Sequence, residues 1–184
     1  MPVYHSNFKN NNYKKACNLS LIPILSKKEP CMDFKLIKEC SDQVDIIDES
    51  IFYFRANSFF SNFKLESDGD KVLVYISVFI SKCLNSWNDH KSDLKKCKEI
   101  MNNLITECEW GFTLKNHFLN SFLTNTPEEA VELVKYLKTV REQTAFRLYY
   151  LLFESPGCEL DLKYWFGFYR VKFLGFEMPQ IKRY

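Results

Sequence analysis

The sequence predicts an all-α fold of about five helices, in which one central helix near residues 70–87 is surrounded by the others, after an extended N-terminal arm. Only 5 glycines and 6 prolines occur among 184 residues, and 46% of the residues are apolar, which disfavours disorder and sheet-rich folds with many tight turns. Two long apolar segments, 45–63 and 70–87, follow each other with only a short turn between them. This much apolar surface requires a protein core or a partner to cover it.

We interpret residues 1–184 as a single helical domain, a length that buries roughly 70% of the unfolded surface in one core. Residues 1–44 show little periodicity and form the expected arm, residues 45–174 the helical body, and residues 175–184 a tail. The arm contains one apolar island, Leu19–Leu25, whose aliphatic side chains are costly to leave in water. We therefore expect this island to dock onto the body.

The first long helix is expected over Asp45–Phe63. Acidic residues occupy its first turn, where they interact favourably with the helix dipole. Phe52, Ala56, Phe59 and Phe63 follow at the spacing i, i+4, i+7 and i+11, which places them on one helix face.

The central helix is expected over the apolar run Val72–Leu84. A run of this kind is also compatible with a buried strand, but the pattern continues at helical spacing to Trp87 and contains no glycine or proline. The hydroxyls of Ser77 and Ser81 are able to bond to carbonyls one turn earlier in an interior helix. Because the segment is apolar nearly all round, the other helices should enclose it.

A shorter amphipathic helix is expected from residue 92 to about residue 107, with its three lysines outward. Its inward side chains are predicted to be Leu94, Ile100, Met101, Leu104 and Ile105. Residues 111–125 are interpreted as a loop or a broken helix.

The clearest helix start is Thr126-Pro127-Glu128-Glu129, which has the pattern of a capping box with proline at the first helical position. The stop is Ser155-Pro156-Gly157, so this helix should be long. Its predicted apolar stripe comprises Ala130, Leu133, Val134, Leu137, Val140, Leu148, Leu151 and Leu152. A fifth helix is expected over Leu162–Leu174, with Trp165, Phe166, Tyr169 and Phe173 buried.

No arrangement of residues in the sequence is typical of catalysis. There is no phosphate-binding loop and no zinc-protease motif, and the three histidines do not complete a metal-binding pattern. The adjacent carboxylates Asp48/Glu49 and Glu128/Glu129 are explained by helix-start electrostatics. We therefore predict no enzyme activity, no catalytic residues, no cofactor and no metal.

The cysteines, the apolar segments and the net charge indicate the cell compartment and the class of partner. The seven cysteines are odd in number and scattered, as expected of free thiols in a reducing cytosol. No signal peptide opens the chain, and the apolar run Val72–Ile80 is shorter than the ~20 residues of a membrane span. A net charge of +2 does not indicate nucleic acid as a partner. These features predict a soluble cytoplasmic protein without membrane contact.

Several short motifs together resemble one known family. They occur in this order: MPxYHS at 1–6, LIPI at 21–24, DIIDExIFYFRANxFF at 45–60, LVYIS at 73–77, YL at 136–137, REQT at 141–144, RL at 147–148 and KYW at 163–165. The ordered set resembles subunit 3, also called p21-Arc, of the actin-related protein 2/3 complex. The segments 25–44, 88–110 and 175–184 depart from the family pattern.

The resemblance implies a helical, non-catalytic structural subunit of a seven-protein assembly that starts new actin filaments as branches on existing ones. Its implied partners are the actin-related proteins 2 and 3, mainly the third, the other subunits and the actin filament. The implied location is the actin cytoskeleton, and no cofactor is expected because nucleotide binding belongs to the actin-related subunits.

Interfaces take much of their energy from aromatic and arginine anchors. On the matched motifs we therefore predict four exposed interface residues, namely Tyr4, Arg55, Arg141 and Arg147. Two alternatives stay open at this point. One is a helical adaptor, unrelated to actin, that binds a peptide in a groove. The other is a nucleic-acid binder that uses the C-terminal segment 163–184, where five basic residues accompany one acidic residue.

Overall fold

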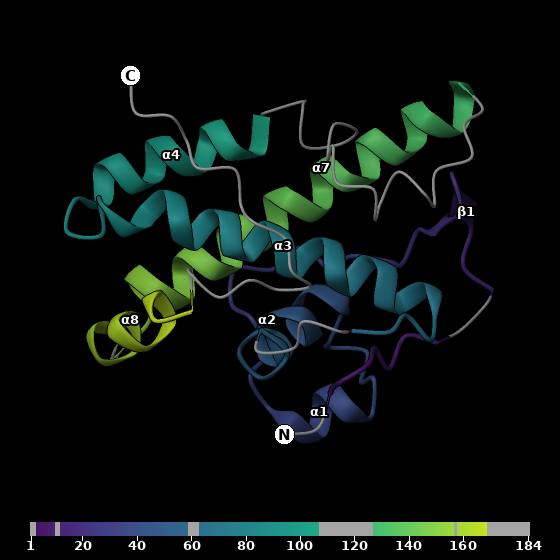
Figure 1. The fold of residues 1–184 in the computed structure, drawn as a ribbon, viewed down its shortest axis with the longest axis horizontal. Helices are drawn as coiled ribbons and strands as arrows, with labels where there is room; N and C mark the ends of the chain where they lie inside the picture. Colours follow the sequence, from purple (N-terminus) through teal and green to yellow (C-terminus); the bar gives the residue numbers. More distant parts are fainter. Residues whose placement is uncertain (1–2, 10–11, 59–62, 107–126, 157, 169–184) are drawn as a thin grey trace.

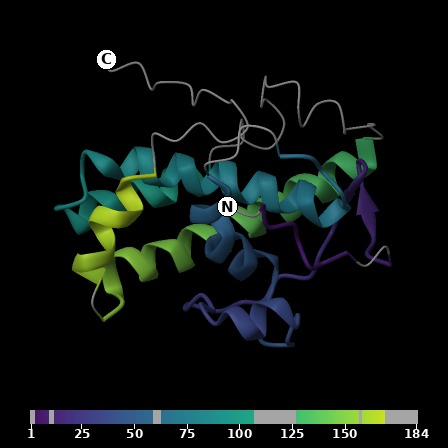
Figure 2. The ribbon, with the colours of Figure 1, turned by 60° about the horizontal axis from the view of Figure 1, so that its bottom comes forward.

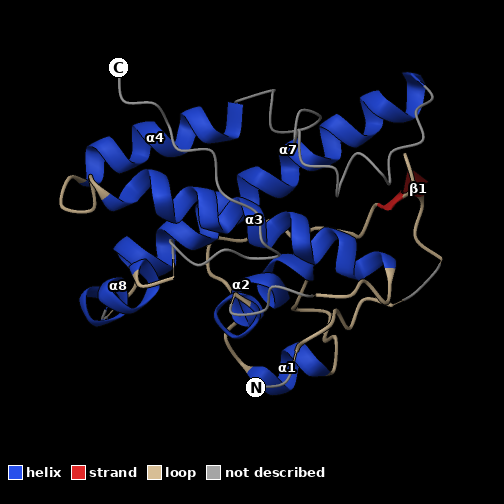
Figure 3. Cartoon of the chain, viewed as in Figure 1, coloured by secondary structure: helices blue, strands red, loops and turns tan. Residues whose placement is uncertain are grey.

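The computed structural model of the protein describes residues 3–9, 12–58, 63–106, 127–156 and 158–168. Helices dominate these ranges, and strands are confined there to one short pair (Figure 3). The all-α prediction is therefore confirmed. A hydrophobic core cluster includes residues of the arm and of every long helix. The division into a single domain stays a prediction.

The arm is less extended than expected. It contains an antiparallel pair of strands, β1 (Lys15–Ala16) and β2 (Leu19–Ser20), joined at Cys17 and Asn18. These two turn residues have φ angles of 49° and 60°, the left-handed values that suit the twist of a tight hairpin. The apolar island docks as predicted, since Leu19 and Ile22 are buried.

A short helix in the arm, α1 (Phe34–Lys38), has no counterpart in the sequence prediction. Its start is local, because the Asp33 carboxylate accepts hydrogen bonds from the backbone N–H groups of Lys35 and Leu36. Ile37 is its one fully buried residue. Five residues are too few for a clear periodic pattern, which explains why the sequence did not predict this helix.

Helix α2 (Ile46–Asn57) begins as predicted, since Asp45 and Asp48 form a reciprocal capping box. The predicted end at Phe63 is wrong, because the helix ends at Asn57. The amide side chain of Asn57 bonds to the backbone of Tyr4, so the arm lies against the helix end. Phe63 is nevertheless buried, although outside the helix.

Helix α3 (Asp68–Asn88) is the predicted central helix, and a capping box of Ser67 and Asp70 starts it. The predicted back-bonding is present, since Ser77 Oγ donates to the Leu73 carbonyl at 2.8 Å and Ser81 Oγ to the Ser77 carbonyl at 3.1 Å. Figures 1 and 2 show α3 running through the middle of the molecule, and it contacts α2, α4, α7 and α8.

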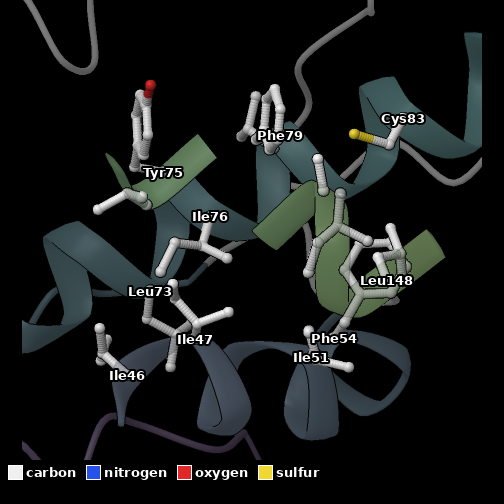
Figure 4. Close-up of a cluster of buried hydrophobic side chains, with 14 of the residues drawn as sticks. Ile46, Ile47, Ile51, Phe54, Leu73, Tyr75, Ile76, Phe79, Cys83 and Leu148 are labelled. Atoms are coloured by element: carbon white, nitrogen blue, oxygen red, sulfur yellow. The ribbon is translucent and has the colours of Figure 1, made fainter. Parts of the chain in front are cut away.

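The core lies on both sides of α3. In Figure 4, Ile46, Ile47, Ile51 and Phe54 of α2 point toward α3, where they meet Leu73 and Ile76. Tyr75 and Phe79 point to the opposite side of α3 in the same view. All eight of these side chains are at most 2% exposed, so α3 has no solvated face in this region.

Helix α4 (Leu94–Thr106) matches the predicted amphipathic helix. Met101, Leu104 and Ile105 are buried as expected. Leu94 is a correction, because it is 50% exposed at the first helical position. Cys97 is instead the buried residue of this turn. Trp87 Nε1 donates a hydrogen bond to the backbone carbonyl of Cys97.

The long helix is α7 (Pro127–Tyr149), which continues into a π-helical turn, η1 (Tyr150–Glu154), and ends at Ser155 as predicted. Val134 is a second correction, because it is 38% exposed rather than part of the buried stripe. Thr126 and the segment 107–126 lie outside the described residues, so the predicted capping box and the loop at 111–125 are not described.

The last described helix, α8 (Cys158–Phe166), starts and ends earlier than the predicted 162–174. Trp165 and Phe166 are buried, as expected. The predicted core positions Tyr169 and Phe173 lie outside the described residues. Helix α8 packs against η1 and α3, at the left of Figure 1.

Candidate functional site

Tyr4, the first predicted interface residue, lies at the C-terminal end of α2. Its backbone N–H donates to Asn57 Oδ1 at 3.0 Å, and Asn57 Nδ2 donates back to its carbonyl at 2.8 Å. The Tyr4 ring stacks on Tyr53 with 4.8 Å between centroids. Tyr4 itself is partly exposed.

The residues that follow Tyr4 dock onto two buried carboxylates, and we call this set the Glu49 cluster (His5, Ser6, Asn7, Glu49 and Asp70). Ser6 Oγ and the Asn7 N–H each donate to Glu49 at 2.7 Å. The Ser6 N–H donates to Asp70 Oδ1 at 2.7 Å, and His5 Nδ1 lies 3.1 Å from Asp70 Oδ2. The motif at residues 4–7 therefore joins the starts of α2 and α3.

Glu49 is buried without a neighbouring lysine or arginine among the described residues. Burial raises the pKa of its carboxyl to about 7, the hydrogen bonds from Asn7 and Ser6 oppose the rise, and the Asp70 carboxylate adds to it. Space at the cluster is also tight, because a Cβ added to Gly69 would lie 2.6 Å from the Phe8 carbonyl oxygen. Glycine at 69 therefore permits the arm to approach α3 closely.

A second set of buried charges holds the later part of the arm, and we call it the Arg147 cluster (Lys27, Asp45, Asp48 and Arg147). Arg147 donates to both oxygens of Asp45 at 2.6 Å and to Asp48 Oδ1 at 2.9 Å. It also donates to the Leu25 carbonyl at 2.5 Å, and Lys27 forms an ion pair with Asp48. Arg147 is 0% exposed, so the prediction of an exposed interface residue is wrong here.

Arg141 is the second correction among the four candidates. It is 3% exposed, and its Nη1 donates to the hydroxyl of the buried Tyr75 at 3.0 Å. Burial raises the pKa of Tyr75 while the nearby Arg141 charge lowers it, and the first effect is the larger. Arg141 and Arg147 both lie on α7 but contact different neighbours, namely α3 and the α2–arm junction.

Arg55 is partly exposed in the last turn of α2, as expected of an interface residue. Its guanidinium carbon lies 4.5 Å from the centroid of the Tyr164 ring and 5.4 Å from that of Trp165. Tyr164 is 51% exposed, whereas Trp165 is buried and stacks on Phe54. The structure thus brings Arg55 and Tyr4 to the same end of α2, each with its own aromatic neighbours.

The described residues offer no group of three histidine, cysteine or carboxylate side chains arranged to hold a metal ion. Cys17, Cys31, Cys40, Cys83 and Cys97 are free thiols. Burial raises the pKa of the Cys83 thiol, which suppresses the reactive thiolate there. None of the helices in the described ranges combines the length and apolar character that a membrane crossing needs.

The model of the P21-Arc family, described as the ARP2/3 complex ARPC3 (21 kDa) subunit, matches residues 1–178. The chain belongs to this family. The resemblance inferred from the ordered motifs is therefore confirmed, and it extends through the segments 25–44 and 88–110 that depart from the family pattern.

Individual relatives cover almost the whole chain. A protein of Arabidopsis thaliana named actin-related protein 2/3 complex subunit 3 is 34% identical over 178 residues, which are 94% of this chain and 97% of the relative. Proteins of the same name in Saccharomyces cerevisiae and Dictyostelium discoideum are 31% and 30% identical, over 95% and 94% of this chain and 98% and 97% of their own lengths.

Sequence reasoning missed the residues that receive the arm. Asp45, Glu49, Tyr53 and Asn57 follow one another at i, i+4, i+8 and i+12, so they form one polar stripe along α2. Each bonds to an arm residue: Asp45 to Leu25, Glu49 to Ser6, Tyr53 to Asn7 and Asn57 to Tyr4. Polar residues at helical spacing inside a largely apolar helix were the available signal, and helix-start electrostatics explained only part of them.

Proposed function

We propose that this chain is a non-catalytic structural subunit of an actin-related protein 2/3 complex, in which it supports the nucleation of branched actin filaments. The observation that carries the proposal is the family match over residues 1–178, together with relatives aligned over 94–98% of their own and this chain's lengths. A match of this extent does not favour the alternative of a peptide-binding adaptor unrelated to actin.

The proposed contribution is contact area rather than chemistry. A subunit that bridges larger neighbours shifts them toward a filament-like arrangement only by its differential affinity for that state. The buried polar side chains of the described residues serve the fold: Arg147 and Glu49 fix the arm, and Arg141 bonds to Tyr75. An arm that these contacts hold against the helices supports this role, since a segment ordered before binding loses less entropy when a partner binds.

The finer proposal is that the chain bridges the actin-related proteins 2 and 3, mainly the third, in the cytoplasmic actin cytoskeleton, without a cofactor. Tyr4 and Arg55 are the interface candidates that keep exposed surface. Arg141 and Arg147 are not proposed as direct contacts, because both are buried inside the chain. Their substitution would act on assembly only through the fold.

Affinity purification of the chain from its own cells, followed by native mass spectrometry, tests the proposal. We expect it to co-purify with two actin-related proteins and the remaining subunits. Complexes that lack this chain should accelerate actin polymerisation less in a pyrene-actin assay. If wild-type chain brings no actin-related protein with it, the proposed function is wrong.

A further inference from the structure

Arg55 differs from the buried arginines in having no polar partner among the described residues. Arg147 donates four hydrogen bonds, and Arg141 donates one. Within the described residues, the Arg55 side chain makes only the two aromatic contacts, with Tyr164 and Trp165. Its guanidinium N–H groups are therefore left for another acceptor.

The two aromatic rings that the Arg55 guanidinium contacts are themselves packed against other rings. Trp165 is 1% exposed and stacks on Phe54, with 5.9 Å between centroids and 7° between planes. Tyr164 and Phe168 form a T-shaped pair with 5.1 Å between centroids, so the Tyr164 ring also has a packed neighbour. A group that is held in place before binding loses less conformational entropy when a partner binds it.

We propose that Arg55 and Tyr164 form a docking point for a carboxylate side chain, aspartate or glutamate, of a protein partner. The inference rests on the proposed function, because it names the chemistry by which a neighbouring subunit recognises this chain. A guanidinium matches a carboxylate with two parallel hydrogen bonds. The half-exposed Tyr164 ring adds apolar area and a hydroxyl beside it.

The surroundings favour a protein carboxylate over the phosphates of a nucleic acid. Phosphate backbones are bound by many cations at once, whereas this chain has a net charge of +2 and presents one stacked arginine at this point. Arginine beside exposed tyrosine is the composition of energetic anchors in protein interfaces. A single bidentate pair on an aromatic base is therefore the chemistry that the site supports.

Two variants of Arg55 test the proposal in the assembled complex. Arg55→Glu reverses the charge and should lower incorporation into the complex about tenfold or more, as expected for a lost anchor. Arg55→Lys keeps the charge and introduces an amine that a zero-length carbodiimide reagent joins to a contacting carboxylate. Mapping of the cross-linked peptide then identifies the partner residue.

Lys38→Glu is the matched control. Lys38 is an exposed cation whose Nζ lies 5.9 Å from the centroid of the Phe34 ring, so it makes a similar cation–aromatic contact at another surface. This variant should incorporate normally. Thermal unfolding of the purified Arg55→Glu chain shows whether the variant is folded, and the lysine cross-link remains informative even if it is not.

A cross-link from Lys at position 55 to an aspartate or glutamate of another subunit supports the proposal. It is overturned if that cross-link forms to a carboxylate of the same chain, if no cross-link forms, or if folded Arg55→Glu incorporates like the wild type. Retention on a nucleic-acid column that requires Arg55 would also overturn it. These outcomes are separate from failure of the proposed function, in which wild-type chain co-purifies with no actin-related protein.

Discussion

The Glu49 cluster and the Arg147 cluster attach the same arm to the same helix but balance their charges differently. Each contains two buried carboxylates, Glu49 with Asp70 and Asp45 with Asp48. In the Arg147 cluster a guanidinium contacts both carboxylates, and Lys27 pairs with one of them. In the Glu49 cluster the donors are a hydroxyl and backbone N–H groups, and the His5 ring lies beside Asp70.

The difference shows that hydrogen bonds and a countercharge are not equivalent ways to bury a carboxylate. Two short hydrogen bonds at 2.7 Å do not prevent burial from raising the pKa of Glu49 to about 7. We therefore expect pH to act on the attachment of residues 4–8, and loss of a single cation to act on the attachment of residues 25–31.

The largest effect is expected from Arg147→Met. Removing one partner of a buried ion pair leaves uncompensated charge, here on Asp45 and Asp48, and typically costs about 3–5 kcal/mol. Urea denaturation of the purified chain measures the change in free energy of unfolding. Adding Asp45→Asn to this variant should recover part of the loss. A loss below about 1 kcal/mol would show that the stability of the cluster does not depend on Arg147.

The next effect is the pH dependence that Glu49 contributes. Its pKa is higher in the folded protein than its ordinary value of 4.5, so folding favours the protonated carboxyl. The resulting stabilisation is fully present below pH 4.5 and is lost as the pH rises to about 7, an amount of up to about 3 kcal/mol. Denaturation curves of the wild type and Glu49→Gln across this range isolate the effect.

Glutamine is suited to this comparison because its amide retains an acceptor for Asn7 and is able to donate to the Ser6 hydroxyl. The difference in the free energy of unfolding between wild type and variant should change by up to about 3 kcal/mol from pH 4.5 to pH 7. Equal pH dependence of the two proteins would contradict the raised pKa.

Gly69→Ala should separate the two attachments. Its new Cβ would lie 2.6 Å from the Phe8 carbonyl oxygen and 2.8 Å from Ser6 Oγ, so the arm has to shift. Overpacking of this kind costs about 1–3 kcal/mol. Amide hydrogen exchange should speed up at residues 6–8 and stay unchanged at residues 25–31. Equal changes at both would mean that the arm docks as one unit.

The smallest effect is expected from Lys27→Met. Its side chain is 25% exposed, and Asp48 keeps its contact with Arg147 after the substitution. We expect a loss of about 1 kcal/mol or less, in the range of partly solvated ion pairs. Urea denaturation at low and high salt checks this, since the loss should shrink with salt. A loss as large as that of Arg147→Met would mean that both cations are required.

Local signals in the sequence predicted the helices well and their ends less well. The starts of α2 and α3 follow from side chains that bond to backbone groups within three residues, as in the Asp45/Asp48 and Ser67/Asp70 capping boxes. The ends of α2 and α8 were predicted too late, by pattern alone. At α2 the arm packs against the end of the helix, since Asn57 bonds to Tyr4 across 53 residues of sequence.

The sequence by itself determined the helical class, the enclosed central helix, the family and the absence of catalytic motifs. These depend on the hydrophobic period, the helix caps and the order of motifs, which can all be recognised within short stretches of the chain. Only the tertiary structure decided that Arg141 and Arg147 point inward while Leu94 and Val134 remain exposed. The physical reason is distance along the chain: Arg147 is buried by carboxylates 99 and 102 residues away and a carbonyl 122 residues away. An arginine's burial depends on such partners, and no local pattern records where the fold will place them.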